Sequence, residues 1–196
     1  YKRQGYSYSS FDEMRTFVLS SLLINPELPV DDLIRSYFNQ EYPVSKKWLY
    51  DYYTELENNA QSGKRLGLYA GIRESEKAFL YPDQFIKFYD EMGDFVSEAK
   101  GKERKKLHEL QTALSFTRLE LGRDHGFDAY GYAKRNGKEL QPVPQARKWI
   151  TQLKEYKAFT GMEYYNESAY EIDYYIKEWE QYLLSSDIKK LSLIHI

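Results

Sequence analysis

The stretch that decides the fold is Leu107–Leu121, LHELQTALSFTRLEL, together with the earlier Phe85–Val96, FIKFYDEMGDFV. In the first stretch the spacings alternate between three and four residues, and this aligns one side of a helix: Leu107, Leu110, Leu114, Thr117 and Leu121. The aromatic and aliphatic residues of the second stretch do the same. Gly101 is the break between them, and a break this short suits two antiparallel helices. The centre of the chain therefore predicts a helical hairpin whose first helix opens at Pro82.

Three further helices are expected before this hairpin. Ser10 and Glu13 have the spacing of a capping box, in which each side chain bonds the other residue's backbone N–H. Ser45 is suited to cap the third helix. Pro26 and Pro43 end the first two, because the residue before a proline disfavours the helical conformation. The predicted helices cover residues 11–24, 30–40 and 46–56.

Two helices are expected after the hairpin. Pro144 fits the first turn of one, where its missing N–H costs nothing. Gly161 ends that helix, because glycine readily adopts the left-handed conformation found after helix ends. Ser168 and Glu171 form a second capping box, which begins a last helix running to about residue 185.

The segment Asp124–Gln141 is predicted to be a long loop. It is rich in glycine and charge and shows no convincing alternation of apolar and polar residues, so no strand is expected there. The expected fold class is all-α, with about six or seven helices in antiparallel hairpins or a bundle.

The composition excludes several kinds of partner. Lys and Arg (28) nearly balance Asp and Glu (30), and the net charge of −2 offers none of the positive surface that nucleic acids require. No stretch approaches the roughly 20 apolar residues of a membrane span. The absence of cysteine removes disulfides and thiolate metal ligands. We therefore expect no nucleic-acid partner and no membrane span.

The sequence contains no catalytic or metal motif that we recognise. The three histidines are scattered and lack the spacing of paired metal ligands. Asp124 and His125 adjoin each other in the expected loop, where neighbouring side chains point apart, and no Gly-x-Ser-x-Gly motif is found. The basic run Lys100–Lys106 is interpreted as charge that faces water around the hairpin turn. We expect no catalytic residue, no metal and no cofactor in this chain.

Aromatic residues are unusually frequent, with 20 Tyr, 10 Phe and 3 Trp. Tyrosine combines a flat apolar face with a hydroxyl, so it suits both helix interfaces and contacts with sugar rings. The tyrosine pairs within the helices are assigned to the core or its boundary. Tyr1, Tyr6 and Tyr8 precede the first helix and are the better candidates for sugar contacts.

Both ends of the sequence suggest how it was obtained. It begins with Tyr1 rather than Met and enters patterned sequence at once, so we expect that an N-terminal portion is missing. Residues 191–196, LSLIHI, match the translation of a transposon adapter used in sequencing libraries, CTG TCT CTT ATA CAC ATC. We exclude these six residues from the fold.

Three segments carry a family resemblance: Arg3–Tyr6, Phe11–Leu28 and Tyr164–Ser168. They resemble the bacterial family catalogued as domain of unknown function 4838, in which Gln-Gly and an aromatic residue precede F-x-E-L-R and then L-L-W-N-P-D-L. The sequence differs from that pattern at Arg3, where the family favours Glu, and at Ile24, where it favours Trp. The resemblance extends over nearly the whole chain.

The resemblance implies a role in carbohydrate metabolism. Family members look like glycoside hydrolases related to α-glucuronidases and hexosaminidases, with a (β/α)₈ catalytic barrel followed by a helical region. On this resemblance residues 1–24 are the last strand, loop and helix of a truncated barrel, and residues 25–190 are the helical C-terminal region. The two carboxylates of such enzymes would lie upstream. Gln4, Tyr6 and Tyr8 would edge the sugar pocket, and the protein would be exported to the periplasm or cell surface.

The expected function is therefore that of a non-catalytic, helical C-terminal part of a glycoside-hydrolase-like protein acting on polysaccharide or oligosaccharide. It would pack against the barrel. The alternative is a free-standing helical module that binds a protein partner through an apolar groove, and this alternative predicts an exposed aromatic patch.

Overall fold

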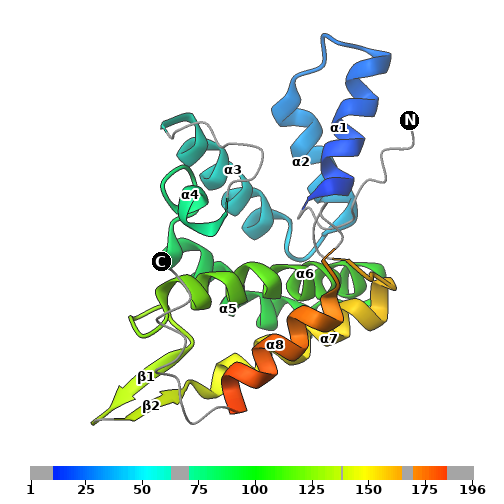
Figure 1. Cartoon of the computed structure of the whole chain (residues 1–196). Coiled ribbons are helices and arrows are strands. Elements are labelled where there is room, and N and C mark those ends of the chain that lie inside the picture. The colour runs from blue at the N-terminus through cyan, green and yellow to red at the C-terminus, as the bar shows by residue number, and fades with distance from the viewer. Residues whose placement is uncertain (1–10, 63–70, 138, 165–169, 185–196) are drawn as a thin grey trace. The chain divides into compact units, whose positions relative to one another are not determined.

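The computed structural model describes residues 11–62, 71–137, 139–164 and 170–184. Within these residues it contains eight helices and one two-stranded antiparallel sheet (Figure 1). The predicted, predominantly helical class is confirmed. The chain divides into two compact units, residues 1–111 and 112–196, and the long helix α6 contributes to both.

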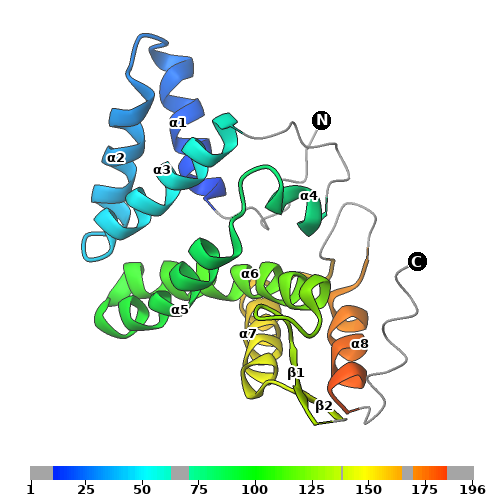
Figure 2. The ribbon, with the colours of Figure 1, turned by 90° about the vertical axis from the view of Figure 1, so that its left-hand side faces the viewer.

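The first unit holds the N-terminal helices. α1 packs against α2 and α2 against α3, so these three form consecutive hairpins (Figures 1 and 2). The predicted boundaries of the first two helices agree with the structure to within one residue, whereas α3 extends six residues beyond its predicted end and the short helix α4 was not predicted. The elements are α1 (Asp12–Ile24), α2 (Val30–Glu41), α3 (Lys46–Ser62), α4 (Ile72–Glu76), α5 (Pro82–Glu98) and the first part of α6 (Gly101–His125).

The capping box expected at the start of α1 depends on a residue outside the described part of the chain. Phe11 takes the N-cap position, with a left-handed φ of 68°, and Ser10 lies outside the described residues. The ring of Phe11 instead packs edge-on against Phe38 and Tyr53, at centroid distances of 5.9 and 5.6 Å. The side chain of Glu13 contacts Lys106 and Tyr37 rather than a backbone amide. Aromatic packing and an ion pair therefore hold the start of α1.

The predicted hairpin of α5 and α6 is confirmed. Pro82 is the first residue of α5, and only Ala99 and Lys100 separate α5 from α6. Gly101 begins α6 with a φ of 54°, a conformation that glycine adopts without strain. Halfway along α5, a Cβ placed on Gly93 would lie 3.9 Å from Nε2 of Gln111, so the two helices pack side by side.

Stacked aromatic rings join α3 to α5 in the core of the first unit. The ring of Phe88 stacks on Tyr52 at 3.6 Å and on Trp48 at 4.3 Å, and Trp48 also stacks on Phe95. Tyr52 is buried, whereas the neighbouring Tyr53 is only partly buried. This pair therefore agrees with the assignment of the tyrosine pairs to the core or its boundary.

The second unit is built from the rest of α6 and four further elements. α7 (Pro144–Thr160) packs against α8 (Ile172–Leu184), and between α6 and α7 lies a hairpin of β1 (Ala133–Asn136) and β2 (Glu139–Pro142). Gly161 ends α7 in the left-handed conformation, as predicted. α8 begins at Ile172, so Glu171 precedes it and Ser168 is too early to be its N-cap.

The prediction that Asp124–Gln141 is a loop is wrong in two places. α6 continues to His125, and Ala133 to Pro142 form the two-stranded hairpin, with Gly137 at its turn in the left-handed region. The strands escaped detection because β1 reads Ala-Lys-Arg-Asn, with one buried residue followed by three exposed ones. Such a strand has no period-two pattern for a sequence to reveal.

We predict opposite effects for alanine at two glycines. A Cβ on Gly131 would lie 2.1 Å from the carbonyl oxygen of Gly126, so Gly131→Ala must displace backbone. We expect it to lower the free energy of unfolding by about 2 kcal/mol or more. Gly93 is helical and has room, so Gly93→Ala should raise the same quantity by about 0.5 to 1 kcal/mol. Urea denaturation followed by circular dichroism measures both, and equal effects would contradict the close approach at Gly131.

Candidate functional site

The residues proposed to touch sugar are not placed by the structure. Gln4, Tyr6 and Tyr8 lie outside the described residues, as does the adapter-like segment 191–196.

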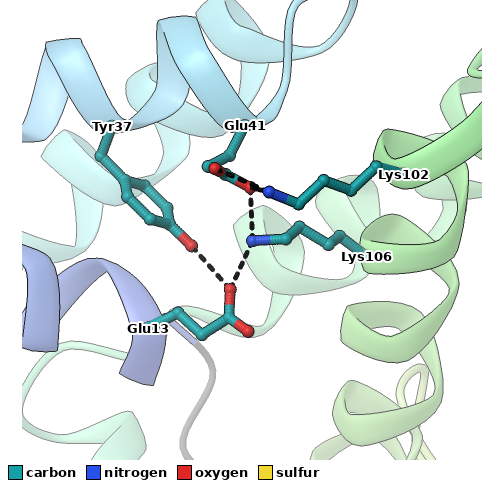
Figure 3. A network of polar contacts seen from close by, with 5 residues as sticks. All are labelled: Glu13, Tyr37, Glu41, Lys102 and Lys106. Carbon is teal, nitrogen blue, oxygen red and sulfur yellow. Dashed lines mark hydrogen bonds and ion pairs between the residues drawn. The ribbon is translucent and has the colours of Figure 1, made fainter.

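A lysine-bridged network joins three helices of the first unit (Figure 3). Nζ of Lys106, on α6, lies 2.5 Å from Oε2 of Glu13 on α1 and 2.6 Å from Oε2 of Glu41 on α2. Lys102, one turn earlier on α6, also contacts Glu41 at 2.8 Å. The hydroxyl of Tyr37 donates a hydrogen bond to Glu13 at 3.1 Å. The side chain of Lys106 is only 13% exposed, which corrects the interpretation that the whole basic run faces water.

The network shifts the pKa values of its members in the directions that favour the charged carboxylates, the charged ammonium and the neutral tyrosine. The hydrogen bond from Lys106 lowers the pKa of Glu13, and that from Lys102 lowers the pKa of Glu41. Burial opposes the charge on Lys106, but the two carboxylates outweigh it and raise the pKa of this lysine. Burial and the charge of Glu13 raise the pKa of Tyr37. All four groups therefore keep their usual charges at neutral pH.

This arrangement is unsuited to acid–base chemistry on a sugar. Since both carboxylates lie within 2.6 Å of one ammonium, their nearest oxygens are at most about 5 Å apart, close to the spacing of a retaining glycosidase. The ammonium, however, occupies the space between Glu13 and Glu41. A general acid needs a raised pKa, whereas these two are lowered. The network is therefore a structural tie between α1, α2 and α6.

We predict that acid weakens this tie. Because folding lowers the pKa values of Glu13 and Glu41, their contribution to stability is present above the usual glutamate pKa of 4.5 and is lost as the pH falls below it. Lys106→Met should remove part of this acid dependence and lower the free energy of unfolding at pH 7 by about 1 to 2 kcal/mol. The value is modest because Glu13 is 68% exposed and screened by water.

Urea denaturation between about pH 3 and pH 7 measures this effect. Lys87→Met is the control, because Lys87 forms a long, exposed pair with Glu91 at 3.9 Å and should change stability by less than about 0.5 kcal/mol. Equal losses from the two substitutions would show that the network contributes nothing specific.

A buried glutamate fixes the start of α3. Glu103, on α6, is 5% exposed, and its carboxylate accepts hydrogen bonds from the backbone N–H groups of Val44 and Ser45 and from the Ser45 hydroxyl. Ser45 does precede α3, as predicted, but its hydroxyl binds Glu103 instead of capping the helix. Three donors satisfy the buried charge, which would otherwise be costly.

We predict that Glu103→Ala lowers the free energy of unfolding by about 2 to 4 kcal/mol, because it leaves two backbone amides without their acceptor. Arg104→Ala, at the exposed neighbouring position, should change it by less than about 0.5 kcal/mol. The denaturant midpoints of the two variants measure this difference. A Glu103 variant as stable as the Arg104 variant would refute the role of Glu103 in fixing the start of α3.

An arginine surrounded by aromatic rings occupies the second unit. Cζ of Arg123 lies 5.1, 5.3 and 5.6 Å from the ring centroids of Tyr175, Trp179 and Tyr182, which recur along α8. Tyr175 donates a hydrogen bond to Glu120, and Arg123 approaches Glu178 at 3.5 Å. These groups fasten α6 to α8 by cation–π and charge contacts. Nothing in the sequence identified Arg123 as the partner of these rings.

His125 forms a close contact with Asp128, three residues further along the chain. Its Nδ1 lies 2.5 Å from Oδ2 of Asp128, and its ring packs edge-on against Tyr130 at 5.1 Å. The contact spans three residues at the end of α6, where a helix can bring such side chains together. The structure therefore connects His125 to Asp128 and to Tyr130 in a local cluster.

Exposed apolar side chains gather around the turn between α1 and α2, which forms the tip of that hairpin (Figure 2). Leu23 and Ile24 are 88% and 87% exposed. Leu23 is nine residues after Met14, so at about 100° per residue it lies on the opposite side of α1 from that buried methionine. We call this set the α1–α2 tip: Leu19, Leu23, Ile24, Leu28 and Val30.

Two exposed tyrosines form a second surface feature. Tyr170 and Tyr174 are 52% and 60% exposed, and their ring centroids lie 6.4 Å apart. Tyr174 belongs to the first turn of α8, and its neighbour Tyr175 is buried. The second unit therefore presents an aromatic pair to solvent.

Comparisons with known proteins give no relative: no protein-family model, curated protein or solved structure matches this chain. None of the helices in the described residues has both the length and the apolar character needed to cross a membrane.

Proposed function

We propose that this chain is the non-catalytic, helical C-terminal part of a bacterial, exported glycoside-hydrolase-like protein that acts on polysaccharide or oligosaccharide. The α1–α2 tip packs against the catalytic barrel, which supplies the reactive carboxylates. Gln4, Tyr6 and Tyr8 contribute to the edge of the sugar pocket. The proposal rests on the sequence resemblance and on one structural observation, the two-sided apolar character of α1.

The two sides of α1 have different surroundings. Met14 and Val18 are buried on the side that faces the rest of the first unit, whereas Leu19 and Leu23 are exposed on the other. The last helix of a barrel followed by a helical region needs two apolar sides, because it is covered by strands on one and by helices on the other. Each exposed leucine of this kind lacks up to about 2 kcal/mol of the stabilisation that burying its side chain would give.

Sequencing the source DNA outward from the codon for Tyr1 tests this proposal directly. An upstream barrel with paired carboxylates at its strand ends supports it and identifies the residues for mutation. A start codon or an unrelated domain immediately upstream refutes it.

A substitution in the α1–α2 tip gives a second test. We predict that Leu23→Asp changes the free energy of unfolding of the present chain by less than about 0.5 kcal/mol, since its side chain is already exposed. In the protein with its upstream region, the same substitution should lower the melting temperature by several degrees, because it places a charge in the interface. Tyr174→Asp, an exposed position on the other unit, is the control. Equal melting temperatures for the two variants would contradict the packing of the tip.

The exposed pair Tyr170 and Tyr174 favours the alternative, a free-standing helical module that binds a protein partner. Tyrosine is enriched in protein interfaces because its ring buries a large area while its hydroxyl finds a partner. The alternative requires no upstream barrel, so the sequencing experiment separates the two functions.

A further inference from the structure

A groove between α2 and α3 combines cationic and aromatic side chains and is distinct from the lysine-bridged network. Its volume of about 460 Å³ lies within the range of small-molecule sites. α2 contributes one side and the first turns of α3 the other. The lining residues are Arg35, Phe38, Asn39, Lys46, Lys47, Tyr50 and Asp51.

One end of the groove is held in place by Asp31. Oδ2 of Asp31 accepts a hydrogen bond from Nε of Arg35 at 2.8 Å, and Oδ1 accepts one from the hydroxyl of Tyr50 at 2.5 Å. Cζ of Arg35 lies 3.9 Å from the centroid of the Tyr50 ring. The guanidinium therefore stacks on the Tyr50 ring and is oriented by the hydrogen bond from its Nε. Its two terminal amino groups form the fork that binds the oxygens of a carboxylate or phosphate.

Hydrogen-bond donors exceed acceptors in this groove. Lys47 forms an ion pair with Asp51 at 2.5 Å, which uses the only acidic residue of the lining. The side chains of Lys46 and Asn39 form no hydrogen bond or ion pair with any residue in the part of the chain that the structure describes. Both lysines also stand in the first turn of α3, where the helix dipole disfavours positive charge unless an anion is near.

We propose that this groove binds a small molecule that carries a carboxylate or phosphate group. Lys46 and Arg35 contact the anionic group, Asn39 donates a further hydrogen bond, and Tyr50 lines the space for the body of the molecule. The proposal is independent of the upstream barrel, because every residue it uses belongs to α2 or α3.

Three probes with one sugar body test it: glucose 6-phosphate, glucuronate and uncharged glucose. The full chain labelled with ¹⁵N is titrated with each while amide shifts are followed by NMR. We expect saturable shifts around the groove with one or both anions, and none with glucose. Binding to only one anion tells whether phosphate or carboxylate is the group recognised. Raising the salt concentration should weaken the binding of either anion, because exposed charges make the contacts.

Two substitutions decide whether the groove is the site. Lys46→Gln should weaken anion binding about fivefold or more, whereas Lys87→Gln, which removes one exposed lysine charge on α5, should change it less than about twofold. Because Lys46 has no partner among the described residues, its variant should keep the wild-type spectrum. Absence of saturable shifts, equal shifts with glucose, or unchanged binding by the Lys46 variant would overturn the proposal.

Discussion

The carboxylate of Glu103 is almost wholly removed from water and accepts hydrogen bonds from two backbone amides and one hydroxyl at the turn between α2 and α3. Apolar packing alone tolerates small shifts of one helix along another. A buried charge does not, because it is stable only where its hydrogen-bond donors surround it. Lys106, almost one turn later on the same helix, then reaches Glu13 and Glu41. The polar contacts of α6 therefore set where α1, α2 and α3 stand in the first unit.

The sequence predicted the helices well because their apolar spacing and their proline and glycine boundaries act locally. The starts of α5 and α7 at Pro82 and Pro144, and the end of α7 at Gly161, are of this kind. The hairpin after α6 was missed because three consecutive exposed residues erase the strand pattern. The partners of Lys106 and Glu103 were missed for a different reason, since they depend on residues about 60 to 90 positions away in the chain, which no local pattern encodes.

Helix α1 provides the structural observation on which the proposed function rests. Its buried side is explained by α2, but its exposed leucines and isoleucine are not explained by any element among the described residues. Large apolar side chains grouped at one end of a hairpin usually mark a contact surface. The candidate sugar residues, by contrast, rest on the resemblance alone, since Gln4, Tyr6 and Tyr8 precede the part that the structure describes.

The hairpin of β1 and β2 also bears on how the protein behaves at high concentration. Among the described residues each strand pairs only with the other, so each has an outer edge of the kind to which a strand of a second molecule can add. The sequence opposes such growth. β1 carries the charges of Lys134 and Arg135, and β2 ends in Pro142, which has no N–H to offer a new strand. These features oppose the addition of a strand from a second molecule to this hairpin.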